Sequence, residues 1–298
     1  NDGNRELTIT SEKDFACLAL SLQFGALWNG VYGLNPNYRN QLLGSSVTIN
    51  LSANINLSGT GIGGLGFDSA SNLQIFQGTF NGNGHTITLG IGEPYGKRGD
   101  NAIAPNDASA GNGKIYRHSR LGLFAAIGGS TANSQIATVN NLTVDGSIKF
   151  DNGSGVDAGS LAATITGNAT FSGVTCKPKI ACDDTFGNDV NIGGIAGSMT
   201  GAGTVTFDSD NTGGSTKAQA TVKTGAALNG NTRIGGAVGY VADVVAIVNV
   251  ASLEVSDATA GENAITAGDS ANNKKSQVGG FIGSIAQGSQ QKNVNITG

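Results

Sequence analysis

Few residues in this sequence have the types and spacing that catalysis of sugar-chain cleavage requires. Such cleavage uses two carboxylates that face one bond, or a basic residue beside acids that bind calcium. Asp183 and Asp184 form the only adjacent acidic pair, and a solvated loop explains them without a partner motif. Asp208 and Asp210 resemble the start of a calcium loop, but the other ligand positions are missing. We therefore predict no catalytic residue, no metal and no cofactor.

The two histidines do not favour a catalytic triad, which needs a histidine beside a nucleophile and an acid. His85 lies in the sequence Asn83-Gly84-His85, which is typical of a structural corner. His118 belongs to a short basic stretch, 114–120, that could bind an anionic glycan or a neighbouring subunit, with a solvated strand face as the ordinary alternative. The candidate ligand-binding residues of this stretch are Lys114, Tyr116, Arg117 and Arg120.

A second candidate is the tripeptide Arg98-Gly99-Asp100, within the Gly-, Asn- and Asp-rich segment 92–113. On a loop, its carboxylate could reach the metal ion of an integrin and its guanidinium an acidic groove. A motif of three residues is weak evidence by itself. The long segment is the better indication, because recognition residues concentrate on loops held by a rigid scaffold.

Threonines recur as Thr-x-Thr pairs, for example at Thr86/Thr88 and Thr204/Thr206. A regular threonine ladder on one sheet face would suggest ice binding. The pairs do not return at one place in each repeat, so we attribute them to the β-propensity of threonine.

The three cysteines give limited information. Cys176 and Cys182 flank a short segment that a disulfide could close, which would indicate an oxidising compartment, and two reduced thiols are the alternative. Cys17 lies in an apolar helical segment, and we expect it to be a buried thiol.

Composition indicates a folded chain and excludes some partners. Glycine supplies 48 of 298 residues, while 38% of the chain is hydrophobic and 13% is charged, so it does not have the composition of a disordered chain. The net charge is −4 and the 17 basic residues are scattered, which argues against nucleic-acid binding. No stretch approaches the roughly 20 apolar residues that a membrane span needs.

One pattern organises the chain: an apolar residue, a glycine, and then small and apolar residues. Its first glycines are Gly122, Gly159, Gly193, Gly235 and Gly279, at intervals of 37, 34, 42 and 44 residues. A constant core with an elastic spacer indicates a solenoid. Short alternating strands with Gly, Ser and Asn turns lie between the motifs, and this order predicts a parallel β-helix.

The predicted architecture is one β-helix domain, 1–298, with a helix at one end. A strand at 7–10 is followed by Ser11 and Asp14, which resemble a capping box, and apolar spacing predicts a helix over 11–24 that stops at Gly25. The helix would cover the open first coil. Loops are expected at 92–113 and 176–189.

These motifs resemble the GLUG-type repeats of bacterial surface proteins. The resemblance rests on Ile192-Gly193-Gly194-Ile195-Ala196-Gly197, on the equivalent segments 234–239 and 278–283, and on an opening coil at 76–87. The motifs that begin at Leu121 and Ala158 depart from it, because they lack the second glycine. The resemblance implies a right-handed parallel β-helix in a secreted or cell-surface bacterial protein, often an adhesin.

The expected function is therefore that of a non-enzymatic extracellular adhesin or surface scaffold. Its partner would be a glycan or protein of a host cell or of the extracellular matrix. Two alternatives stay open: a carbohydrate-active β-helix enzyme, and the subunit of a surface fibre that associates through its terminal coils. Two or more acids in a groove with Arg or Lys would favour the enzyme, and a sheet face covered with Thr, Asn and Ser would favour the adhesin.

Overall fold

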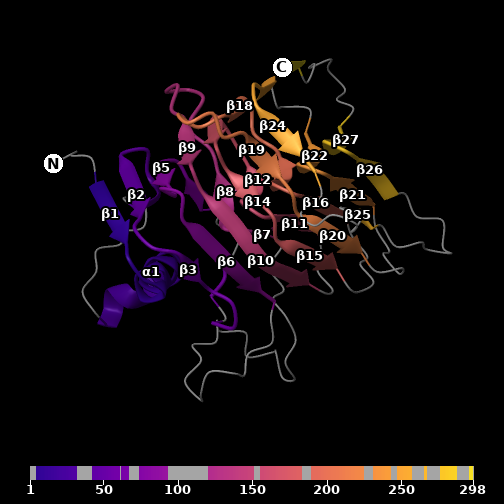
Figure 1. Cartoon of the computed structure of the whole chain (residues 1–298). Helices are drawn as coiled ribbons and strands as arrows, with labels where there is room; N and C mark the ends of the chain where they lie inside the picture. The colour runs from indigo at the N-terminus through magenta and orange to yellow at the C-terminus, as the bar shows by residue number, and fades with distance from the viewer. Residues whose placement is uncertain are drawn as a thin grey trace.

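In the computed structural model the chain winds into successive coils whose strands stack in parallel, which confirms the predicted parallel β-helix (Figure 1). The strands belong to four sheets, of which three begin in the first coils and the fourth begins at residue 120. The structure describes residues 5–31, 42–60, 62–66, 74–92, 120–150, 155–182, 189–224, 231–242, 247–256, 265–266, 276–286 and 295–297.

The four sheets, here named A to D, hold these strands. Sheet A contains β1 (Arg5–Ile9), β2 (Val47–Leu51), β5 (Thr79–Asn81), β9 (Ala137–Asn140), β13 (Ala169–Ser172), β18 (Thr204–Asp208), β23 (Ile247–Val250) and β28 (Asn295–Thr297). Sheet B contains β3 (Ile55–Asn56), β6 (Thr86–Ile91), β10 (Thr143–Phe150), β14 (Thr175–Cys176), β15 (Lys179–Cys182), β19 (Thr216–Ala218), β20 (Thr221–Thr224), β24 (Leu253–Val255) and β25 (Ile265–Thr266). Sheet C contains β4 (Ile75–Phe76), β8 (Phe124–Ile127), β12 (Ala162–Ile165), β17 (Ala196–Met199), β22 (Val238–Val241) and β27 (Ile282–Ile285). Sheet D contains β7 (Arg120–Leu121), β11 (Val156–Gly159), β16 (Val190–Gly193), β21 (Thr232–Gly235) and β26 (Ser276–Gly279).

Each return of the glycine motif is one turn of the helix. The chain passes from sheet A through B, D and C before it re-enters sheet A, and Gly159 pairs directly with Gly193, which pairs with Gly235. In the first motif, the connection from the sheet D strand to the sheet C strand, counted between paired residues, has one residue fewer than in the other motifs. Phe124 therefore pairs with Ala162, not with Leu161, which a residue-by-residue alignment of the two motifs would place opposite it.

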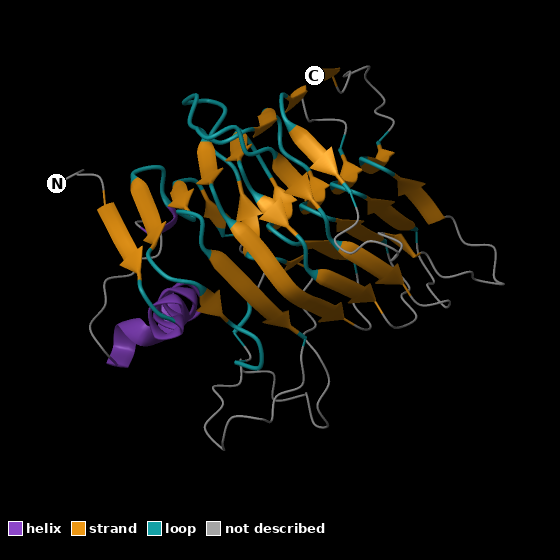
Figure 2. Cartoon of the chain, viewed as in Figure 1, coloured by secondary structure: helices purple, strands orange, loops and turns teal. Residues whose placement is uncertain are grey.

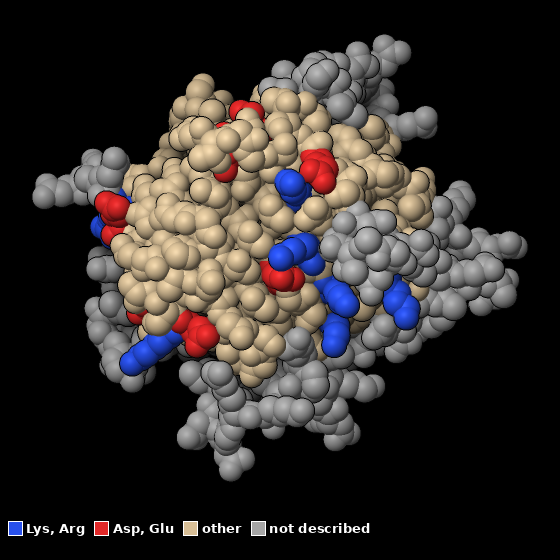
Figure 3. Space-filling model, in the orientation of Figure 1, with Lys and Arg blue, Asp and Glu red and all other residues tan. Residues whose placement is uncertain are grey.

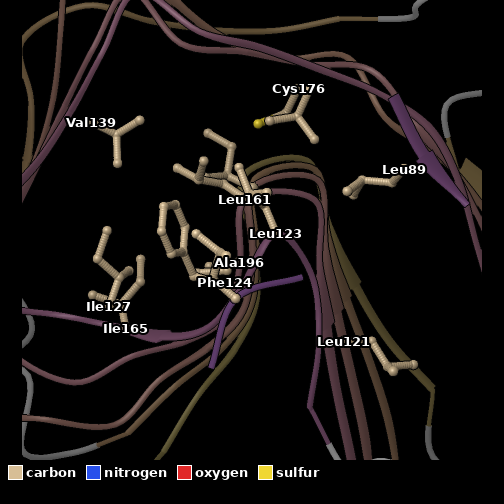
Figure 4. Close-up of a cluster of buried hydrophobic side chains, with 14 of the residues drawn as sticks. Leu89, Leu121, Leu123, Phe124, Ile127, Val139, Leu161, Ile165, Cys176 and Ala196 are labelled. Carbon is tan, nitrogen blue, oxygen red and sulfur yellow. The ribbon is translucent and has the colours of Figure 1, made fainter. Parts of the chain in front are cut away.

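The motif builds an arch that projects into the interior. The chain rises through a sheet D strand, turns at a large apolar residue such as Leu123 or Leu161, and returns through sheet C (Figure 4). The two legs touch through their backbones: a Cβ on Gly239 would lie 2.5 Å from the Ile192 nitrogen, and one on Gly283 would lie 2.6 Å from the Ile234 carbonyl carbon. Small residues are therefore required inside the arch.

The core lies around the arch tip, between it and the inner faces of sheets A and B. Aromatic rings pack between neighbouring coils: the ring centroids of Phe76 and Phe124, on sheet C, are 5.0 Å apart, and those of Phe171 and Phe207, on sheet A, are 5.6 Å apart. All four rings are fully buried. Aliphatic positions stack in the same way, as Ile127 and Ile165 do beside Val139 (Figure 4).

One helix, α1 (Glu12–Val31), lies at the first coils and contacts β1 and β3 (Figure 2). Phe15, Leu18 and Leu22 are buried, as the predicted capping role requires. The helix continues seven residues beyond the predicted end at position 24, so Gly25 does not terminate it. A glycine within a helix costs only about 1 kcal/mol, so it need not end the helix.

The predicted capping box is present in a modified form. The Ser11 hydroxyl accepts from the Asp14 amide at 3.3 Å, and one carboxylate oxygen of Asp14 accepts from the Ser11 hydroxyl at 2.9 Å and from the Thr10 hydroxyl and amide at 2.6 and 3.0 Å. The hydrogen bonds from Thr10 and Ser11 hold the pKa of Asp14 below its ordinary value.

Replacing Asp14 with alanine is expected to lower stability at neutral pH but not in strong acid. A depressed folded-state pKa means that the carboxylate stabilises the fold above its unfolded-state pKa, and that this contribution disappears as the pH falls through the folded-state pKa. Thermal unfolding of wild type and Asp14→Ala from neutral pH to about pH 2 should show the two midpoints converging. Glu12→Ala is the control, and a gap that stays constant with pH would contradict the assignment.

The prediction of a loop over 176–189 is wrong for the first half of this range. Residues 179–182 form β15 and Cys176 ends β14, and both strands pair with the single long strand β10. The segments 93–119, 151–154, 183–188, 225–230 and 267–275, which include most of the expected loop 92–113, lie outside the described residues. Each of the five leaves a sheet B strand and ends before a sheet D strand, so their anchor points share one corner of the coil.

Candidate functional site

Most of the predicted ligand-binding residues cannot be placed. Arg98, Gly99, Asp100, Lys114, Tyr116, Arg117, Asp183, Asp184 and His118 all lie outside the described residues. Arg120 is described: it begins β7 and pairs in register with Asp157 on β11. Its Nε atom is buried and has no hydrogen-bond partner in the described part of the chain.

The remaining candidates have local structural roles. One oxygen of Asp210 accepts from the Thr212 amide, the Thr212 hydroxyl and the Gly214 amide at 2.7 to 2.9 Å, so its carboxylate closes its own turn. These bonds, led by that from the Thr212 hydroxyl, hold the pKa of Asp210 below its ordinary value. His85 forms the predicted corner, where Asn83 and Gly84 have positive φ angles of 52° and 79°.

The structure contains Cys176 and Cys182 as thiols, not as a disulfide. Their partners on β10 are Val144 and Phe150, six residues apart on one strand. That separation is about 20 Å at the rise of a strand, whereas a disulfide needs Cα atoms within about 7 Å. Both side chains are buried, and burial raises the pKa of Cys176 far above its ordinary value. Cys17, expected to be buried, is exposed.

A regular row of threonines runs along the outer face of sheet A, and the comparison of Thr-x-Thr pairs in the sequence did not detect it. Single threonines, not pairs, occupy the same register position on five successive strands. Each is half-buried between its neighbours, and strands of a sheet lie about 4.8 Å apart. The row consists of Thr48, Thr79, Thr138, Thr170 and Thr206.

A second polar row lies two residues further along each of these strands. Asn81 donates to the Asn50 side-chain oxygen at 2.8 Å, and Asn140 donates to that of Asn81 at 3.1 Å. Asn50 in turn donates to Glu6 on β1 at 2.6 Å. The row continues through Ser172 to Asp208. We call these two rows together the threonine face.

A third polar row lies inside the arch, where sheets C and D approach each other. Asp157 on β11 accepts three hydrogen bonds: from Asn191 at 2.7 Å on one oxygen, and from Ser198 at 2.8 Å and Thr164 at 3.1 Å on the other. Ser198 and Thr164 belong to the sheet C leg and are fully or almost fully buried. The carboxylate therefore joins the two legs of the arch.

The arch row continues on the next coil through Arg233. Its guanidinium donates to Asn191 at 3.0 Å and to Asp189 at 2.9 Å, and it lies 4.6 Å from the centre of the Tyr240 ring. Partial burial raises the pKa of Asp189, but hydrogen bonds from Asn231 and Arg233 and the charge of Arg233 more than offset it, so the pKa lies below its ordinary value. Asp189 is therefore held as a structural anion.

The polar row inside the arch was not predicted from the sequence, although the sequence contains a signal for it. The residue two positions before the first glycine of each motif is polar in all five copies: Arg120, Asp157, Asn191, Arg233 and Gln277. A strand that is buried on one face and polar on the other predicts such alternation, but only the fold of the arch shows that the polar side faces a second sheet.

These features define the class of protein as a parallel β-helix solenoid with regular polar rows on its faces. Comparisons with family models, with curated proteins and with solved structures found no match. The likeness to GLUG-type repeats thus stays a prediction. No helix among the described residues is long and apolar enough to cross a membrane.

Proposed function

We propose that this protein is a non-enzymatic adhesin or surface-scaffold segment that acts outside a bacterial cell. Its rigid coils would present two features to a glycan or protein of a host cell or its matrix. One is a regular polar face, and the other is the set of segments at the corner between sheets B and D. The single observation that carries the proposal is the threonine face. A sheet face covered with Thr, Asn and Ser favours an adhesin over a β-helix enzyme.

The acids of the described residues also favour this proposal over the enzyme. A glycosidase needs a carboxyl group that can exchange a proton and a second one across the substrate. Asp157, Asp189 and Asp210 each accept several hydrogen bonds from their own surroundings. For Asp189 and Asp210 these hydrogen bonds hold the pKa below its ordinary value, so both are poor proton donors at neutral pH.

Charges placed on the threonine face are expected to abolish adhesion while leaving the fold intact. The test compares wild type with Thr138→Lys/Thr170→Lys on a glycan array and on cultured epithelial cells. We expect at least a tenfold loss of binding, because each lysine must be desolvated on contact with an uncharged ligand. The charge-matched control, Thr131→Lys/Asn133→Lys, alters an exposed turn and should bind normally. Equal binding by all three proteins would contradict the proposal.

Further measurements on the same proteins separate the alternatives. Reproducible release of reducing ends or unsaturated sugars from pectin, alginate or glycosaminoglycans would replace the adhesin with an enzyme. A thermal hysteresis gap that disappears in Thr138→Lys/Thr170→Lys would identify ice as the ligand of the face.

Association through terminal coils has one supporting observation. Val278 and Ile285, on β26 and β27 of sheets D and C, are 51% and 44% exposed, although their equivalents in earlier coils are buried. Light scattering across a concentration series tests for a fibre subunit, and a strict monomer would count against it.

A further inference from the structure

Positive charge gathers on one face of a protein whose net charge is negative. The chain carries −4 overall, yet five lysines point outward from sheet B, accompanied by two acids. In the space-filling view the basic side chains gather over this sheet, which faces the viewer (Figure 3). The five are Lys149, Lys177, Lys179, Lys217 and Lys223.

Two of the five lysines are neutralised by neighbours. Lys177 lies 3.4 Å from Asp145, and Lys217 lies 3.3 Å from Glu254. Lys149, Lys179 and Lys223 are exposed, and none of them forms an ion pair with another described residue. The uncompensated charge of the face is therefore concentrated in these three, which we call the lysine triad.

The β-helix register fixes the spacing of the triad. Lys149 and Lys223 pair with the same residue, Ala181, from opposite sides, so their Cα atoms lie about 10 Å apart across two strand spacings. Lys179 stands two residues before Ala181 on the intervening strand, which displaces it by about 7 Å along the strand. The three Cα atoms thus form a triangle that is set by the pairing of three coils, with Ser147 and Thr221 as neighbours of Lys179 in register.

We propose that the lysine triad binds a linear anionic polysaccharide. Repeating carboxylates or sulfates would pair with the ammonium groups, and the Thr221 hydroxyl would hydrogen-bond a sugar hydroxyl between them. This extends the proposed adhesin function by naming a ligand class, and it concerns a different sheet from the threonine face.

Other anionic partners fit the face less well. An acidic peptide could not add a strand here, because β15 is already paired on both sides, with β10 and β20. Nucleic-acid binding relies on many phosphate contacts, and three lysines on a chain of net charge −4 supply few. Binding to an anionic membrane would be strengthened by apolar side chains beside the lysines. The residues next to Lys179 in register are instead the polar Ser147 and Thr221.

Immobilised polygalacturonate and heparin are the probes, because one presents carboxylates and the other mainly sulfates. We expect the wild type to bind at least one of them with an affinity that weakens as salt rises. Lys149→Gln/Lys179→Gln/Lys223→Gln should bind about tenfold less tightly or worse, and the corresponding triple arginine variant should bind like the wild type. The stronger probe identifies the anionic group.

A matched control separates the effect of the lysine triad on binding from the effect of the net charge. Thr131→Glu/Ala132→Glu/Asn133→Glu brings the net charge to −7, as the triple glutamine variant does, but on an exposed turn between β8 and β9. Unchanged melting temperatures verify that the variants fold. The proposal is overturned if the turn variant loses as much affinity as the triad variant, if neither probe binds, or if single-stranded DNA or phosphatidylserine vesicles bind better than both. Because Thr138→Lys/Thr170→Lys leaves the triad intact, its failure to adhere does not bear on this result.

Discussion

Replacing Gly193 with alanine is expected to destabilise the protein by about 3 kcal/mol or more. A Cβ at this position would collide with the Ala196 carbonyl oxygen and would lie 2.6 Å from that of Ala237 and 2.8 Å from the Gly239 nitrogen. All three atoms are backbone, so no rotamer change can make room. The legs of the arch would have to separate, and the stacked coils on either side would have to follow.

Gly280 provides the matched control for Gly193. It belongs to the last described copy of the motif, and a Cβ there would meet nothing within 4 Å. Gly280→Ala should therefore change the unfolding midpoint little. Urea unfolding followed by circular dichroism measures both variants. Similar midpoints for the two variants would contradict the close-packed arch.

The second large effect is expected at Asp157. Its replacement with alanine removes the acceptor of three hydrogen bonds and leaves the hydroxyls of Ser198 and Thr164 inside the arch with only each other, 3.3 Å apart. Unsatisfied buried donors cost about 1–3 kcal/mol each, and because these two hydroxyls can partly compensate each other, we expect a total loss of about 3 kcal/mol. The free energy of unfolding from urea titration is the measurement.

A double-mutant cycle attributes the Asp157 effect to the arch. Ser198→Ala alone should destabilise the protein, but should cost much less in the Asp157→Ala background, because its acceptor is already gone. Asp157→Asn serves as the conservative variant, since it keeps one acceptor oxygen and should retain part of the stability. Additive effects of the two alanine substitutions would show that the carboxylate does not join the legs.

The repeats carried enough information to predict the β-helix, because a coil that stacks on a copy of itself imposes the same residue type at the same place. Gly159, Gly193 and Gly235 are glycine for one reason, the close approach of two backbones, and the sequence displays that constraint directly. The helix near the N-terminus was predicted in place but not in length, because α1 extends past Gly25 to Val31.

The polar rows were not predictable in the same way. The threonine row needs the register between strands as far apart as Thr79 and Thr138, and the spacer between them varies too much to align by eye. Of the Thr-x-Thr pairs seen in the sequence, Thr86/Thr88 belongs to sheet B, and Thr204/Thr206 contributes only Thr206 to the row on sheet A. The arch row depends on two sheets that meet only because the motif reverses the chain, and a strand pattern alone does not reveal what the polar side faces.

The five segments that join sheet B to sheet D differ in length and start from the same corner of the coil. Their shared position affects how the sequence of such a protein can change in evolution. Lengthening a segment between sheets B and D moves no residue of the stack, because Gly159, Gly193, Gly235 and Gly279 keep their pairing whatever the spacer length. The entropic cost of a longer flexible loop grows only slowly with its length. Insertions and deletions at this corner are therefore tolerated, and the segments there can change in length while the threonine face and the lysine triad stay in register. Other connections vary as well, since seven residues join β18 to β19 where two join β13 to β14.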